Sequence, residues 1–197
     1  MFQTNAELIL ASQSSRRIDF FSELGLRFTS YPADINETRR ENEAPIPFVK
    51  RIACEKAEHV GKRYSTAWIV SADTIVTIDQ DVLGKPQSVG EAAEMLMRLS
   101  GKEHEVQTGY CLFCEHESIR IVNNVMTTVQ FAPFAEDVAQ SYIKTGEPFD
   151  KAGAYGIQGL GGILVAGISG SYSNVVGLPM AEIITLLQLY KVISPRP

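Results

Sequence analysis

The sequence predicts an α/β protein whose helices pack on a mixed β-sheet. Short apolar segments with strand character alternate along the chain with segments whose apolar residues recur at helical spacing. Two long segments in the middle, 105–114 and 118–131, are separated only by the polar turn 115–117, as in a β-hairpin. A hairpin adds an antiparallel pair to a sheet whose other connections pass through helices, so the sheet should be mixed.

The first predicted elements are a buried strand and a helix. Residues 8–11 are four consecutive apolar residues, and Ile18, Phe21 and Leu24 then follow at helical spacing until Gly25, where a helix would stop. Apolar content and polar breaks define the next elements in the same way. These are a strand at 27–31, an exposed polar loop at 32–47, a helix at 48–60, and strands at 67–70 and 75–78 separated by 71–74.

The second half of the chain shows clear helix boundaries. Ser88 and Glu91 form a capping box for a helix that Gly101 would end. Gly146 would close another helix, and Pro179 stands near the first position of the last one. The remaining predicted elements are the two long strands, a helix at 135–144, a glycine-rich segment at 153–162, a strand at 163–168 and a helix at 179–190.

Composition places the chain among ordinary globular proteins. It has 197 residues, 45% hydrophobic and 21% charged, which predicts a single domain over 1–197 with a core that needs no disulfides. The net charge of −5 argues against general nucleic-acid binding, so an anionic ligand would need a local basic pocket. No apolar run reaches the roughly 20 residues of a membrane span, and no signal peptide is evident. We expect a cytoplasmic protein without membrane contacts.

The three cysteines are expected to be structural thiols. Cys111 and Cys114 form a CxxC, but they lie within a predicted strand, where an odd separation places them on opposite faces. A redox CxxC usually opens a helix, and a zinc site needs more ligands.

The segment from Ser12 to Arg17 is the first with chemical character. It joins the first strand to the first helix and places Arg16 and Arg17 in the first helical turn, where cations oppose the helix dipole. A bound anion would remove this conflict, because backbone N–H groups, serine hydroxyls and two guanidinium groups would all face one phosphate. The alternative is an N-cap followed by two solvated arginines.

Three further segments carry candidate side chains. Asp73 comes at the end of an apolar strand, where a carboxylate often binds a divalent metal or orients water, although an Asp in a turn is also common. In Gly84-Lys85-Pro86 the proline fixes the chain beside a lysine suited to a phosphate, unless Lys85 is a plain surface residue. Within 150–159, the Gln158 amide could hydrogen-bond a base edge, or the loop could simply pack on the core.

Two other charged residues are weaker candidates. Lys56 lies one turn beyond Ile52 on the inner side of its helix and would need a partner, whereas Glu37 lies in an exposed loop. Cations and carboxylates together have the balance that a triphosphate with a divalent metal requires. The contributing residues are Arg16, Arg17, Lys56, Lys85, Asp73 and Glu37.

In chain order, these segments resemble the Maf family of nucleoside triphosphate pyrophosphatases. The resemblance implies a fold related to the inosine triphosphate pyrophosphatases, with an elongated, twisted, mixed sheet flanked by helices and two lobes around a cleft. It also implies cleavage of a nucleoside triphosphate to the monophosphate and pyrophosphate, dependent on magnesium or manganese. The matching segments are 8–17, 71–74, 84–86, 99–101 with His104, 150–162, 170–172 and 176–179.

The resemblance also implies roles for individual residues. Asp73 would accept the proton of the attacking water and, with Glu37, face the metal. Substrate choice would depend on Arg16, Thr74 and Gln158, whereas the phosphate-facing set would be Ser12, Arg17, Lys56 and Lys85.

Two local variants refine the expectation. The segments Ala72–Thr74 and Gly156–Gly159 look like those of the branch that acts on dTTP and UTP, and Gln158 could pair with the carbonyl and N3–H of a pyrimidine.

The chain departs from the family at one position of the first turn. The family usually has Ser-Pro-Arg-Arg where this chain has Ser14-Ser15-Arg16-Arg17. Because proline preorganises the first helical position, we expect a looser turn here with activity retained.

Other hypotheses remain open at this point. The family's association with septum formation and cell-division arrest suggests a nucleotide-responsive regulator, with or without catalysis. A third reading is a phosphate-binding α/β domain that has no catalytic activity. The expected partner in each case is a nucleoside triphosphate, and a homodimer stays open.

Overall fold

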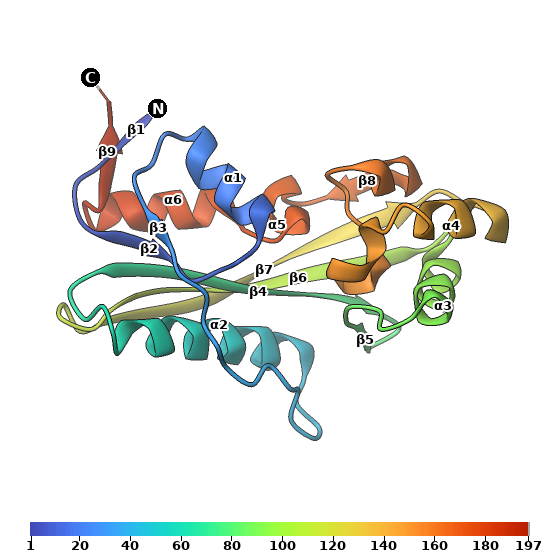
Figure 1. Cartoon of the computed structure of the whole chain (residues 1–197), viewed down its shortest axis with the longest axis horizontal. Coiled ribbons are helices and arrows are strands. Elements are labelled where there is room, and N and C mark those ends of the chain that lie inside the picture. The colour runs from blue at the N-terminus through green and yellow to red at the C-terminus, as the bar shows by residue number, and fades with distance from the viewer. Residues whose placement is uncertain (197) are drawn as a thin grey trace. The chain divides into compact units, whose positions relative to one another are not determined.

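The structure is a computed structural model that describes residues 1–196 (Figure 1). By its internal contacts the chain divides into two compact units, which are described separately. Unit 1 consists of Met1–Asp73, Thr108–Asn124 and Gly177–Pro197, and unit 2 of Thr74–Gln107 and Val125–Val176. The expectations of a single domain and of a cleft between two lobes stay predictions.

The main sheet combines parallel and antiparallel strands. Its strands are β2 (Leu8–Leu10), β3 (Thr29–Ser30), β4 (Trp68–Ile78), β5 (Asp81–Leu83), β6 (Glu103–Cys114), β7 (Ile119–Phe131) and β8 (Val165–Ser169). Within residues 1–196 their order is β3-β2-β4-β6-β7-β8, and β5 pairs with β4 off this path. Strand β2 is parallel to β3 and β4, whereas β5 and β8 are antiparallel to β4 and β7. The predicted mixed sheet is confirmed.

Unit 1 packs helices on both faces of its part of the sheet. Figure 1 shows α2 (Pro45–Gly61) on one face and α1 (Ser15–Glu23) and α6 (Met180–Leu189) on the other. The apolar stripe of α2, with Ala53 and Ala57, packs on Ile9 and Ile69 of the strands. Strand β6 needs a glycine below this helix, because a Cβ at Gly109 would lie 2.4 Å from the carbonyl carbon of Val49.

Unit 2 has its own core beneath two helices. Helices α3 (Val89–Leu99) and α4 (Glu136–Ile143) contribute buried side chains that pack with those of the strands and of the glycine-rich segment. His104 lies within this core, and its Nε2 is 2.8 Å from the Tyr155 hydroxyl. Burial lowers the pKa of His104 to about 4. The Ser88 hydroxyl accepts a hydrogen bond from the Glu91 N–H, so the predicted N-cap of α3 is confirmed.

The structure corrects the prediction of two strands at 67–70 and 75–78. Strand β4 runs without a break from Trp68 to Ile78, because the polar residues of 71–74 find partners within the fold. The Ser71 hydroxyl, for example, donates to the Ala53 carbonyl of α2 at 2.5 Å. Asp73 therefore lies inside a strand and not at its end.

Several elements went unpredicted, among them β5, and several boundaries moved. The chain ends form a small antiparallel sheet of β1 (Phe2–Thr4) and β9 (Ile193–Pro195), and α5 (Tyr172–Val176) lies in a segment to which the sequence assigned no element. Helix α2 begins at Pro45, three residues before the predicted start. Across residues 1–196, no helix has the length and apolar character to cross a membrane.

Candidate active site

The first part of the site is the turn that leads from β2 into α1. Ser12 is buried, and its Oγ accepts a hydrogen bond from the Ser14 N–H at 3.1 Å. Ser14 is the N-cap residue of α1, but its side chain makes no capping hydrogen bond. The N-cap of the alternative interpretation is therefore not made by the Ser14 hydroxyl, and Ser12 stabilises the turn instead.

Arg17 connects this turn to two other segments of unit 1. Its Nε donates to the Gly177 carbonyl at 2.7 Å, and its Nη1 donates to the Ala72 carbonyl at 2.8 Å and to the Ser12 Oγ at 3.5 Å. Burial lowers the pKa of Arg17, and the negative charge of Asp73 opposes that shift. The alternative of a solvated side chain is therefore wrong for Arg17. Arg16 lies half-buried in the same helical turn.

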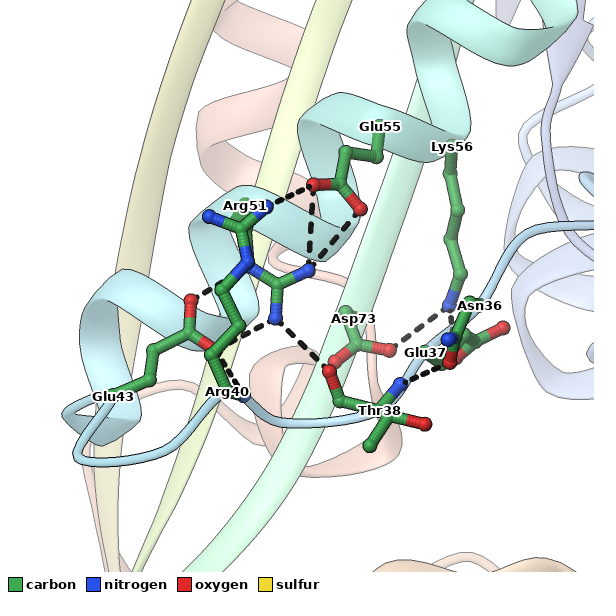
Figure 2. A network of polar contacts seen from close by, with 9 residues as sticks. All are labelled: Asn36, Glu37, Thr38, Arg40, Glu43, Arg51, Glu55, Lys56 and Asp73. Atoms are coloured by element: carbon green, nitrogen blue, oxygen red, sulfur yellow. Dashed lines mark hydrogen bonds and ion pairs between the residues drawn. The ribbon is translucent and has the colours of Figure 1, made fainter.

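Lys56 of α2 lies between two carboxylates of unit 1. Its Nζ donates to Glu37 Oε2 at 2.7 Å and to Asp73 Oδ1 at 2.9 Å (Figure 2). The lysine is only 8% exposed, as its position on the inner side of α2 predicted, and these two carboxylates are the partners that such a lysine needs. Burial raises the pKa of Asp73, and the nearby Lys56 charge opposes that rise.

The strand arrangement places Asp73 just beyond the end of a parallel neighbour. Strand β2 is parallel to β4 and ends at Leu10, which is paired with Val70. Asp73 is therefore three residues beyond the carboxyl end of its parallel neighbour, although β4 itself continues. In open α/β sheets, ligands bind at the carboxyl ends of the parallel strands.

The two carboxylates suit a metal ion that arrives with a substrate. Glu37 and Asp73 both contact the Lys56 ammonium, so the two carboxylates lie near each other. Within residues 1–196, no three His, Cys, Asp or Glu side chains form a metal-binding group. Magnesium is commonly held by one or two carboxylates together with substrate phosphates, and not by an all-protein cage. The residues present fit that mode of binding.

An arginine clasp fastens the loop that carries Glu37 to α2. Figure 2 shows Arg51 of α2 between the carboxylates of Glu43 and Glu55. Its Nε and Nη2 donate to the two Glu43 oxygens at 2.6 Å each, and its Nη1 donates to Glu55 at 3.1 Å. Its Nη2 also donates to the Thr38 carbonyl at 3.2 Å, directly after Glu37. This clasp was missed from sequence, where only the i,i+4 spacing of Arg51 and Glu55 could have indicated part of it.

The other predicted site residues belong to unit 2. Thr74 follows Asp73 in β4 and is half-buried, whereas the Lys85 and Gln158 side chains are exposed. The Gly153 N–H donates to the Gly84 carbonyl at 3.0 Å, so the segments that carry Lys85 and Gln158 lie side by side. Neither the Lys85 ammonium nor the Gln158 amide is hydrogen-bonded to any residue of 1–196. Their roles toward a substrate stay predictions.

Comparison with known proteins places the chain in a family. The family model described as "Maf-like protein" matches residues 7–190. A relative from Desulfotalea psychrophila is 47% identical over 194 residues, covering 98% of this chain and 100% of the relative. A relative from Myxococcus xanthus is 48% identical over 181 residues, covering 92% of this chain and 91% of the relative. Both relatives are named "dTTP/UTP pyrophosphatase".

A solved structure supports the fold independently. The Staphylococcus aureus Ham1 protein matches with a TM-score of 0.54 at 13% identity, covering 94% of this chain and 97% of that one. At that identity the likeness concerns the fold alone, and it agrees with the α/β architecture expected from the sequence. Because the family match and the relatives span nearly the whole chain, the chain belongs to the Maf-like protein family.

Proposed function

We propose that this protein hydrolyses dTTP and UTP to the nucleoside monophosphate and pyrophosphate. The observation that carries the proposal is the buried Lys56 between Asp73 and Glu37, beyond the carboxyl end of β2. The relatives' printed names supply the substrates, and the site supplies carboxylates and cations of the kind that this reaction needs.

Asp73 is the proposed general base. Its Oδ1 accepts the hydrogen bond from Lys56, which fixes the plane of the carboxylate. Its Oδ2, which makes no hydrogen bond within residues 1–196, would take the proton of a water molecule that attacks the α-phosphorus. Positioning by Lys56 matters because a general base must lie within hydrogen-bond reach of the proton it removes.

The cations would neutralise the triphosphate. The Lys56 ammonium and the buried Arg17 guanidinium are fixed by their contacts, so they lose little freedom when a phosphate binds. Glu37 and Asp73 would hold a magnesium or manganese ion, which when bound neutralises phosphate charge. We further propose that phosphate contacts involve Ser12, Arg17, Lys56 and Lys85, and that substrate choice involves Arg16, Thr74 and Gln158.

The Asp73→Asn variant tests the proposal. It keeps the size of the side chain and a hydrogen-bond acceptor for Lys56, but it removes the basic oxygen. Turnover of dTTP should fall by roughly 10²- to 10⁴-fold, the usual contribution of a general base. The control is the unfolding transition in urea, which shows whether the variant stays folded. Unchanged pyrophosphate release by a folded variant would reject the assignment.

Several expectations accompany this proposal. We keep a cytoplasmic location, the absence of nucleic-acid partners and a homodimer as predictions. The regulatory role in cell division also stays a prediction, and it is compatible with catalysis. A catalytically inactive Asp73→Asn protein that still arrested division would separate the two roles.

A further inference from the structure

A glutamate of unit 2 binds the backbone of the glycine-rich segment. Glu147 follows α4 at the start of a short 3₁₀ turn, Glu147–Asp150, and its side chain is half-buried. Its Oε2 accepts a hydrogen bond from the Leu160 N–H at 3.0 Å, and its Oε1 accepts one from the Gly161 N–H at 3.1 Å. One carboxylate thus satisfies two successive backbone donors.

Tyr142 of α4 completes the arrangement. Its hydroxyl donates to Glu147 Oε1 at 2.8 Å and accepts a hydrogen bond from the Gly156 N–H at 3.1 Å. The pair therefore holds both ends of residues 156–161, the first end through Tyr142 and the second through Glu147. We call these two side chains the Tyr142–Glu147 clamp. Gln158 lies midway between the held ends.

The glycines of this segment are those that such a clamp requires. Gly159 has a φ of 133°, and a Cβ there would lie 2.9 Å from Glu147 Oε2. A Cβ at Gly161 would lie 2.5 Å from the Tyr142 hydroxyl oxygen. The backbone thus passes so close to the clamp that it leaves no room for side chains at these positions.

The Glu147 carboxylate of the clamp is ionised at neutral pH. Burial raises the pKa of Glu147, but the hydrogen bonds from the Gly161 and Leu160 N–H groups outweigh it and leave this pKa lowered. A second contact secures the turn itself, because the Lys151 ammonium donates to the Glu147 carbonyl at 2.7 Å. An ionised acceptor makes stronger hydrogen bonds than a neutral one.

We propose that Glu147 and Tyr142 are positioning residues for substrate choice, because they fix the loop that presents the Gln158 amide to a pyrimidine base. The inference rests on the proposed function, in which Gln158 contributes to substrate choice. An amide on a fixed backbone loses less conformational freedom when it binds. A released loop should therefore weaken binding and selectivity while the chemistry at phosphorus continues.

The test compares four single variants of the full chain. Glu147→Gln keeps the shape but removes the charge, Tyr142→Phe removes only the hydroxyl, and Gln158→Ala removes the amide. Glu94→Gln is the matched control, because it makes the same change of charge at an exposed residue of α3. For each variant, kcat and KM are measured with dTTP and with dATP, and hydrogen exchange is followed at 156–161.

The proposal predicts a split between the two kinetic constants. In Glu147→Gln the KM for dTTP should rise roughly tenfold, the effect of losing one charge-assisted hydrogen bond, with kcat nearly unchanged. Tyr142→Phe should show a smaller rise, and in both variants exchange at 156–161 should accelerate. The preference for dTTP over dATP should fall in both. Glu94→Gln should match the wild-type protein in every measurement.

The double variant Glu147→Gln/Gln158→Ala excludes a merely structural role. If the clamp acts through the amide, Glu147→Gln should cause no further loss of selectivity once Gln158 is absent. Full additivity of the two losses would overturn the proposal, as would wild-type exchange at 156–161 in Glu147→Gln. So would unchanged selectivity in Gln158→Ala. A wild-type protein that releases no pyrophosphate from dTTP refutes the proposed function, and the exchange data still decide whether the clamp exists.

Discussion

Replacing Arg51 by methionine should release the loop that carries Glu37. The guanidinium makes two short hydrogen bonds to Glu43, contacts Glu55 and donates to the Thr38 carbonyl. No backbone–backbone hydrogen bond joins 33–43 to another part of the described chain. Side chains therefore link this loop to α2, through Arg51, the Arg40–Glu55 pair and the Lys56–Glu37 pair. Because Arg51 binds both Glu43 and the Thr38 carbonyl, its loss should loosen the backbone beside Glu37 and leave that side chain less well placed beside Lys56.

The structure sets the size of the expected effect. The Arg51 and Glu43 side chains are 14% and 11% exposed. Removing one member of a buried pair costs about 3–5 kcal/mol when the other charge stays buried. Here the loop can move and return Glu43 to water, so the global free energy of unfolding should fall by only about 1–2 kcal/mol. The rest of the effect should appear as local opening of the loop.

Three measurements check this reasoning. Hydrogen exchange at 36–43 should accelerate in Arg51→Met, urea unfolding should give the small global loss, and the KM for dTTP should rise more than kcat falls. Arg51→Lys should recover only part of the effect, because an ammonium cannot bind two carboxylates and a carbonyl in the same geometry. Arg120→Met removes an exposed arginine paired with Glu58 and should change nothing. Unchanged exchange at 36–43 in Arg51→Met would refute the clasp.

Two further predictions concern stability. His104 is held neutral in the folded chain, with a pKa of about 4 against an ordinary 6.5. As the pH falls from 6.5 to 4, this imidazole therefore takes up a proton in the unfolded chain before it does so in the folded chain. The free energy of unfolding should drop by up to roughly 3 kcal/mol across that window. In urea titrations, His104→Gln should reduce the dependence of the free energy of unfolding on pH. Gly109→Ala should lower the free energy of unfolding by about 1–3 kcal/mol through its clash with Val49, as a lowered melting temperature would show.

Local patterns were enough to place most elements and one key side chain. The helical spacing of Ile52 and Lys56 predicted that the lysine points inward, and the structure confirms it. The partners of Lys56 could not be derived in the same way. Glu37 comes from a loop without a regular pattern, so its position depends on how the whole loop folds back onto α2 through Arg51.

The polar residues inside β4 mark another limit of local patterns. The segment Ser71–Thr74 interrupts an apolar run, which predicted a strand end, yet Ser71 is satisfied by a carbonyl of α2. Burial with a partner distant in sequence leaves no periodic trace. The same holds for the pairing of β1 with β9, because it joins the two ends of the chain.

The glycine-rich segment shows how a pattern can be noticed without its cause. The sequence identifies 153–162 as glycine-rich but does not say what each glycine is for. The cause differs from one glycine to the next, because an added Cβ would meet Val76 at Gly153, Lys151 at Gly156 and Glu147 at Gly159. A carboxylate that binds backbone N–H groups has no fixed sequence offset, so only the structure could identify it.

The central claim is that water attacks the α-phosphorus of the triphosphate. Its most direct test is hydrolysis of dTTP in ¹⁸O-labelled water, with magnesium and with manganese, followed by mass analysis of both products. The first products should be dTMP and pyrophosphate, and the label should enter dTMP. Label in the pyrophosphate, or orthophosphate as the first product, would contradict the account.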